Sequence, residues 1–246
     1  MALIFCLVSF IYSQNLPGWF YSPPNHQDRF YGVGISYKYS AHQEAFNDAR
    51  IEAINYIAYQ IQLSIVSGLA SVSSGSKVLT KNYTKVDIDP LLVEKIGKNI
   101  VVLDSIMQNN QATMLIVINK DLSKTEKIYF NPLAINTKKL VHKTAPKWIT
   151  EPPKAAGYFY GIGYGSRYKN VKDSWNDSMQ EAFLDIAQQK SIDNKSLHLI
   201  SQQRYAQDIK WLEQNINTTL KQSRVIERWH DKRADIYYTL AEHQMR

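Results

Sequence analysis

The chain has 246 residues, of which 44% are hydrophobic and 21% are charged. That balance is typical of an ordinary globular protein, so it argues against a disordered chain and against a bundle of membrane-spanning helices. The formal charge of +7 favours contact with anionic surfaces. Because the lysines and arginines are scattered along the chain, a solvated basic surface is the first interpretation and peripheral contact with an anionic membrane surface the second.

Residues 1–13 form an apolar run that is too short to span a bilayer as a mature helix. Ser13 is a small residue at a suitable cleavage position, so the run is interpreted as a secretory signal peptide, with a buried N-terminal strand as the alternative. The single cysteine, Cys6, lies inside the run. The mature chain is therefore expected to have no disulfide, no thiolate nucleophile and no cysteine-bound metal.

The sequence contains two related segments, one in each half of the chain. Each opens with a proline-rich stretch that places a tryptophan, Trp19 or Trp148, at the same distance before a predicted strand. The prolines disfavour a helix, so residues 14–29 are predicted to lie extended over the domain. Each tryptophan is interpreted as a packing anchor over one end of the core, with an exposed ring for stacking on a sugar or peptide as the alternative. Burial of both rings would favour a scaffold, and exposure would favour a ligand platform.

The repeat has a constant offset of 129 residues. Phe-Tyr-Gly-Val-Gly at Phe30–Gly34 returns as Phe-Tyr-Gly-Ile-Gly at Phe159–Gly163. Residues 17–60 align with 146–189 without a gap, and 16 of the 44 positions are identical where chance gives roughly 3. The chain is therefore an internal duplication, and each half is expected to fold alone. The expected boundaries are a signal peptide at 1–13, a first domain at 14–136, a linker at 137–145 and a second domain at 146–246.

In the first copy, residues 30–37 have the aromatic and β-branched content of a strand. Apolar residues at spacings of three and four then predict an amphipathic helix over 41–62, with Ser40 as its N-cap. Residues 67–85 are rich in serine and glycine, which predicts a loop with room for a short strand.

A short helix is predicted at 90–98, started by Asp89. Two strands at 100–107 and 113–119 are expected to form a hairpin, and a closing helix is expected at 122–130.

The second copy repeats this order. Apolar residues from Val171 to Ile186 carry the same helix face, and strands at 223–229 and 235–240 form the matching hairpin. Placing Ala112 on Ala234 gives an offset of 122 for this hairpin. Residues 191–220 allow either one long helix or a strand followed by a helix.

The glycines of the repeated motif lack the third glycine and the adjoining helix of a dinucleotide-binding fingerprint. They are interpreted as strand glycines that admit a crossing aromatic ring, Trp19 or Trp148, or that form a bulge. The repeated pairs at 47–48 and 176–177, each Asn-Asp, are explained by the helix dipole, with a cation site as the alternative. No histidine, serine or carboxylate pattern indicates a catalytic or metal site.

The order of these motifs resembles the lipoprotein-20 family of bacterial envelope proteins. The resemblance rests on Pro-x-Trp, Pro-Pro, aromatic-Tyr-Gly-x-Gly, an alanine-rich helix and a terminal hairpin that carries Trp229. A similar domain occurs in the flagellar assembly protein T. The resemblance implies a small α+β domain at the cell envelope without a defined catalytic activity. Members named as lipoproteins carry a lipidated cysteine, and the position of Cys6 does not suit that modification.

The expected fold class is α+β, with two tandem homologous domains that each pack a small antiparallel sheet against an amphipathic helix. The expected function is that of an exported, non-catalytic interaction protein of the periplasm or outer membrane, bound to envelope proteins and not to nucleic acid. A periplasmic carbohydrate- or lipid-binding protein is the alternative. No cofactor is expected. The candidate structural or ligand positions are Trp19, Gly32, Gly34, Trp148, Gly161, Gly163 and Trp229.

Overall fold

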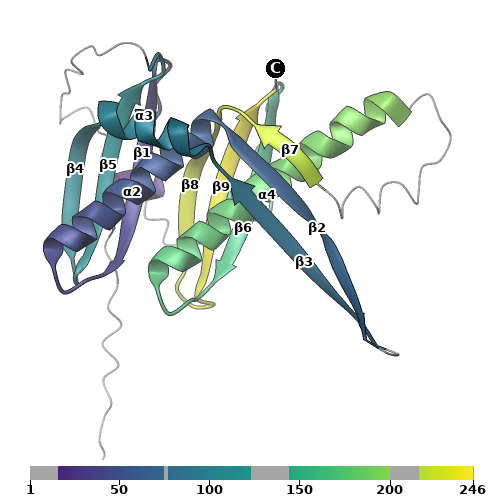
Figure 1. Ribbon diagram of the computed structural model, residues 1–246, viewed down its shortest axis with the longest axis horizontal. Coiled ribbons are helices and arrows are strands. Elements are labelled where there is room, and N and C mark those ends of the chain that lie inside the picture. Colours follow the sequence, from purple (N-terminus) through teal and green to yellow (C-terminus); the bar gives the residue numbers. More distant parts are fainter. Residues whose placement is uncertain (1–15, 75–76, 123–143, 200–215, 246) are drawn as a thin grey trace, which may run out of the picture.

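The computed structural model describes residues 16–74, 77–122, 144–199 and 216–245. Three antiparallel sheets of three strands each are accompanied by helices packed against them, so the expected α+β class is confirmed (Figure 1). The expected signal peptide and most of the expected closing helix and linker lie outside the described residues. Below, the first half denotes the described residues up to 122, and the second half denotes those from 144 onward.

The first half contains a sheet in the order β1-β5-β4. Its strands are β1 (Arg29–Lys38), β5 (Gln111–Asn119) and β4 (Val101–Gln108). β4 and β5 form the expected hairpin, turned by two asparagines that both have positive φ. Two such residues are the mark of a type I′ turn, which matches the twist of the flanking strands.

Two helices cover one face of this sheet. α2 (His42–Ile61) packs on β1 and β5, and α3 (Pro90–Asn99) packs on α2. The Asp89 side chain accepts a hydrogen bond of 2.9 Å from the Leu91 nitrogen, so the expected start of α3 is confirmed. The expected Ser40 cap is wrong, because Ala41 occupies the N-cap position of α2 without a side-chain hydrogen bond.

The second half contains a sheet of the same strand order, β6-β9-β8, with one long helix on it. Its elements are β6 (Tyr158–Ser166), α4 (Val171–Leu199), β8 (Ser223–Asp231) and β9 (Ile236–Gln244). Near the start of β4 and near the start of β8 the pairing shifts register once. In β4 the shift lies between Val102 and Asp104, and in β8 it lies between Val225 and Glu227. The two sheets therefore agree in strand order and in the position of an irregularity.

The strand pairing gives an offset between the two hairpins that differs from the expected value of 122. Gly32 lies opposite Ile116, and Gly161 lies opposite Ala241. The offset from Ile116 to Ala241 is 125, so the value of 122 obtained by matching two alanines is wrong. The reason is turn length, because residues 232–235 form a longer turn than the two asparagines of the first hairpin.

The third sheet contains strands of both halves, in the order β3-β2-β7. β2 (Leu63–Ser74) and β3 (Lys77–Asp87) form a long hairpin that projects from the rest of the molecule (Figure 1). β7 (Ile216–Leu220) belongs to the second half and pairs with the first five residues of β2. The second half thus completes a sheet that the first half begins.

This hairpin overturns the prediction of a loop over 67–85. Serine and glycine are weak strand formers, but a ladder of backbone pairs and the addition of β7 provide pairing that composition does not reveal. Both alternatives for 191–220 are also wrong, since α4 continues to Leu199 and the region ends in strand β7.

The entry segments are not fully extended, contrary to expectation. After Pro17 the chain forms a short helix, α1 (Gly18–Tyr21), and after Pro146 it forms a 3-10 turn, η2 (Lys147–Ile149). Proline is tolerated there because a first helical turn needs no hydrogen bond from its nitrogen.

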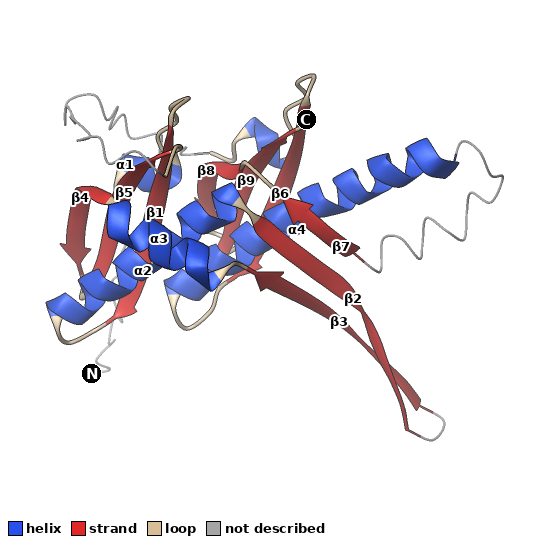
Figure 2. Ribbon diagram, turned by 45° about the horizontal axis from the view of Figure 1, so that its top comes forward, coloured by secondary structure: helices blue, strands red, loops and turns tan. Residues whose placement is uncertain are grey.

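The two sheets stand side by side, with β1 and β8 as their inner strands (Figure 2). We call the boundary between these strands the seam. One continuous cluster of buried side chains crosses it. Its large aromatic members are Trp19, Phe20 and Tyr56 from the first half and Trp175, Phe183 and Tyr237 from the second. A second cluster lies within the first half, between α2, α3 and the sheet.

Candidate binding cleft between the halves

The repeated glycines lie where a helix backbone crosses a strand. A Cβ atom on Gly34 would overlap the carbonyl oxygen of Ala49 and lie 2.6 Å from the Ala53 nitrogen. In the second half, a Cβ atom on Gly163 would collide in the same way with the carbonyl oxygen of Ser178. These contacts explain why both copies have glycine in the strand and small residues on the facing helix.

Gly32 and Gly161, two residues earlier in each strand, are packed just as closely. A Cβ atom on either would collide with a helix carbonyl oxygen, that of Ala53 or of Ala182. The expectation that a tryptophan crosses these glycines is therefore wrong, because the crossing element is helix backbone. The motif serves helix packing in both halves.

The tryptophans are buried. Trp19 is 1% exposed and donates a 2.8 Å hydrogen bond from Nε1 to Oδ2 of Asp104, and Trp148 is 7% exposed. Trp229 is half-buried, and its ring is tilted against Tyr238 with 5.6 Å between the centroids. Burial of Trp19 and Trp148 favours packing anchors over stacking platforms.

A charged cluster spans the seam near the starts of the long helices. Lys172 on α4 is almost fully buried, and its Nζ lies 2.7 Å from Oδ1 of Asp48 and 3.3 Å from Oε2 of Glu52. Burial alone would lower the pKa of Lys172, but the two carboxylates raise it above its ordinary value. The lysine is therefore charged, and it bridges two carboxylates on α2.

Asp48 also accepts a 2.8 Å hydrogen bond from the backbone nitrogen of Tyr37, so it is held by a strand and by the other half. Its repeat counterpart, Asp177, is contacted at 3.3 Å by the hydroxyl of Tyr168. The two Asn-Asp pairs thus have different partners. The described residues nowhere gather three or more histidine, cysteine, aspartate or glutamate side chains as a metal site.

Arg228 on β8 is the second charge at the seam. Its Nη1 donates a 2.8 Å hydrogen bond to the carbonyl oxygen of Phe20, and its guanidinium lies 4.9 Å and 5.5 Å from the ring centroids of Phe20 and Tyr56. Tyr56 in turn donates toward the Val225 carbonyl and accepts from the Val225 nitrogen at 3.0 Å. Burial lowers the pKa of Arg228, although neighbouring Tyr56 and Glu52 oppose the shift.

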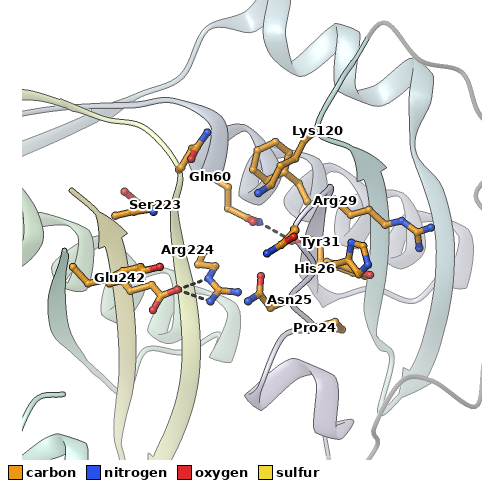
Figure 3. Close-up of a pocket in the computed structure, with 15 residues that line it drawn as sticks. Pro24, Asn25, His26, Arg29, Tyr31, Gln60, Lys120, Ser223, Arg224 and Glu242 are labelled. Carbon is orange, nitrogen blue, oxygen red and sulfur yellow. Dashed lines mark hydrogen bonds and ion pairs between the residues drawn. The ribbon is translucent and has the colours of Figure 1, made fainter. Parts of the chain in front are cut away.

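A cleft of about 270 Å³ opens at one end of the seam (Figure 3). The first half contributes the segment before β1, the start of β1, the end of α2 and Lys120 after β5. The second half contributes the starts of β6 and β8 and the end of β9. Arg29 and Tyr158, which occupy equivalent positions of the two copies, both line it.

The cleft contains cations from both halves. Arg224 binds Glu242 through Nε at 2.6 Å and through a second nitrogen. Lys120 lies 5.4 Å from the centroid of the Phe30 ring. The Gln60 amide donates a 2.6 Å hydrogen bond to the Tyr31 carbonyl, a contact that Gln189 and Tyr160 repeat at 2.8 Å in the second half.

Beside the cleft, Ser223 and His243 form a pair that resembles part of a hydrolytic site. Ser223 Oγ lies 2.9 Å from His243 Nδ1, but Ser223 is fully buried and His243 is 4% exposed. Burial, reinforced by Lys190, lowers the pKa of His243 from 6.5 to about 4. The imidazole is therefore a weak base in contact with an inaccessible hydroxyl, which favours a structural role.

His243 predicts how stability depends on pH. The folded protein prefers the neutral imidazole, so this contribution is complete above pH 6.5 and is lost as the pH falls toward 4. The loss amounts to about 3 kcal/mol. We expect His243→Asn, which cannot titrate, to flatten the dependence of the unfolding free energy between these values, as measured by urea denaturation. Substitution of exposed His42 by asparagine is the control. An unchanged pH dependence in His243→Asn would contradict the assignment.

Sequence reasoning did not find Lys172, Arg228, Lys120 or Arg224. Their partners are far away in the sequence, so no local spacing reveals them. One signal was present for Lys172, because the equivalent position of the first copy holds Gln43. This difference between the copies accompanies the contact of Lys172 with Asp48 and Glu52.

Comparison of the chain with family models, with curated proteins and with solved structures gives no significant match. None of the helices in the described ranges combines the length and hydrophobicity that a bilayer crossing requires.

Proposed function

We propose that the chain is an exported, non-catalytic protein of the bacterial cell envelope, built from two lipoprotein-20-like domains, which binds other envelope proteins. The observation that carries this proposal is the burial of Trp19 and Trp148. The most prominent aromatic residues of the repeat are used for packing, and the glycine motif is used for helix contact. These repeated features serve a rigid body, as a scaffold requires.

The β2–β3 hairpin is the element that we expect a partner to contact. Within the described residues, β7 covers only Leu63–Ser67 of β2, and no further strand pairs with the outer edge of β3. Exposed strand edges bind extended segments by adding a strand, and an isolated two-stranded ribbon is marginally stable in water. A bound envelope protein would supply the missing pairing.

Cell fractionation with crosslinking tests this proposal. We expect the native protein in the envelope fraction, with a mature N-terminus at Gln14 by mass spectrometry and with reproducible crosslinked envelope proteins. A variant that joins Ser67 to Thr84 through Asn-Gly removes the projecting part at a paired position and keeps the residues that pair with β7. We expect this variant to unfold at the same temperature and to lose its crosslinks by about tenfold or more.

One result would contradict the proposed function, and another would contradict only the role of the hairpin. A full-length chain in the cytoplasm without envelope partners would remove export and envelope binding together. Undiminished crosslinks in the shortened variant would retain the envelope function but exclude the hairpin as its contact.

A carbohydrate- or lipid-binding protein is the second candidate function. The tryptophans are buried and so cannot stack on such a ligand. The cleft at the seam favours this function, because it brings polar side chains of both halves to one cavity. The chemistry of that cavity points to a narrower class of ligand.

A further inference from the structure

The cleft has the lining of a site for a small polar ligand. Its volume of about 270 Å³ lies just below the usual range of about 300–1,000 Å³ for small-molecule sites. Amide side chains, which both donate and accept hydrogen bonds, make up about a third of its lining residues. They are Asn25, Gln27, Gln222 and Gln244, together with Gln60, whose nitrogen already donates to the Tyr31 carbonyl. Groups of this kind match the hydroxyls of a sugar, which also donate and accept.

The charge of the cleft is positive. Three cationic side chains, those of Arg29, Lys120 and Arg224, accompany one carboxylate, that of Glu242. Glu242 is already bound by Arg224, whereas no ion pair of Lys120 occurs in the described part of the chain. In Figure 3, Lys120 and Arg224 point into the cleft from opposite halves, and Arg29 points away from its centre. An anionic group between Lys120 and Arg224 would neutralise the charge of Lys120, since the charge of Arg224 is already balanced by Glu242.

Two half-buried tyrosines complete the lining. Tyr31 comes from β1 and Tyr158 from β6, so each half contributes one ring. A tyrosine offers an apolar ring face together with a polar hydroxyl. That combination suits the face of a sugar ring, where C–H groups alternate with hydroxyls.

We propose that the cleft binds an anionic sugar, that is, a ring with several hydroxyl groups and one carboxylate or phosphate group. Lys120 and Arg224 bind the anionic group, the amides bind the hydroxyls, and the tyrosines contact the ring. Because both halves supply ligand contacts, the site exists only in the assembled pair. The proposal rests on the cleft and is independent of export and of protein partners.

Isothermal titration calorimetry of the full chain at low salt tests it with four probes: glucuronate, glucose 6-phosphate, glucose and inorganic phosphate. We expect at least one of the two acidic sugars to bind about tenfold or more tightly than both glucose and phosphate. The stronger of the acidic sugars identifies the anionic group as carboxylate or phosphate.

Lys120→Met keeps the length of this exposed side chain and removes its charge. We expect it to weaken binding of the acidic sugar by about tenfold, whereas the matched control Lys154→Met, at an exposed lysine outside the cleft, leaves binding unchanged. The proposal is overturned if neither acidic sugar binds at about 10 mM, if phosphate alone binds as tightly, or if Lys120→Met has no effect. If the protein binds neither acidic sugar but still crosslinks to envelope partners, the proposed ligand site is rejected and the proposed envelope function is retained.

Discussion

The two halves are expected to be unable to hold their native cores when they are produced separately. A fragment of residues 146–246 loses the rings of Phe20 and Tyr21, which pack edge-on against Trp175 at 5.5 Å and 6.2 Å between centroids. Each large apolar side chain that becomes exposed costs about 1.5–3 kcal/mol, against a total stability of about 5–15 kcal/mol for a typical domain. The loss of several such contacts exceeds what one half can spare. This result would reverse the expectation from the sequence that each half folds alone.

Near-ultraviolet circular dichroism and binding of a hydrophobic dye measure the effect. We expect each fragment alone to show a weak aromatic spectrum and strong dye binding, and a mixture of residues 14–136 with 146–246 to regain the native spectrum. The control is a full chain with a protease site inserted within 137–144, which should keep its spectrum after cleavage. Cooperative unfolding and a native aromatic spectrum in each fragment alone would contradict the prediction.

Gly34→Ala is expected to destabilise the protein by about 3 kcal/mol or more. The added methyl group would overlap the carbonyl oxygen of Ala49, and backbone atoms cannot rotate away as a flexible side chain can. The helix α2 would have to move off the sheet and disturb the buried cluster of the first half. Ordinary overpacking costs about 1–3 kcal/mol, so a collision with backbone belongs at or above the top of that range.

Gly97→Ala is the matched control. A Cβ atom there lies 3.6 Å from Cδ1 of Ile54, an ordinary contact, and α3 gains about 0.5–1 kcal/mol of helix propensity. Urea denaturation of both variants should give free-energy changes of opposite sign. Equal effects would show that the crossing of strand and helix at Gly34 is not close-packed in solution.

Local elements of the fold could be predicted from the sequence because their signals are local. The aromatic and β-branched content of β1, the three-and-four spacing of α2 and the Asp89-Pro90 start of α3 depend on neighbouring residues, and the structure contains all three elements. The repeat also indicated that Gly34 and Gly163 have one role, although the partner was misidentified. The available signal for the helix was the repeated small residue that faces the glycines, Ala53 in one copy and Ala182 in the other.

The remaining features depend on contacts between distant residues. The β2–β3 hairpin has a composition typical of a loop and is paired along one edge by a strand about 150 residues later. Lys172 reaches Asp48 across the seam, and Arg228 reaches Phe20. The cleft likewise arises only when Lys120 and Arg224 are brought together by the packing of the halves. No residue spacing within either copy predicts these contacts.

The pairing of β7 with β2 gives the two halves unequal roles in one sheet. The second half provides the strand β7, and the first half provides the hairpin whose strand β2 pairs with it. Either half moved alone to another protein would therefore carry one strand edge without its partner, at Leu63–Ser67 of β2 or along β7.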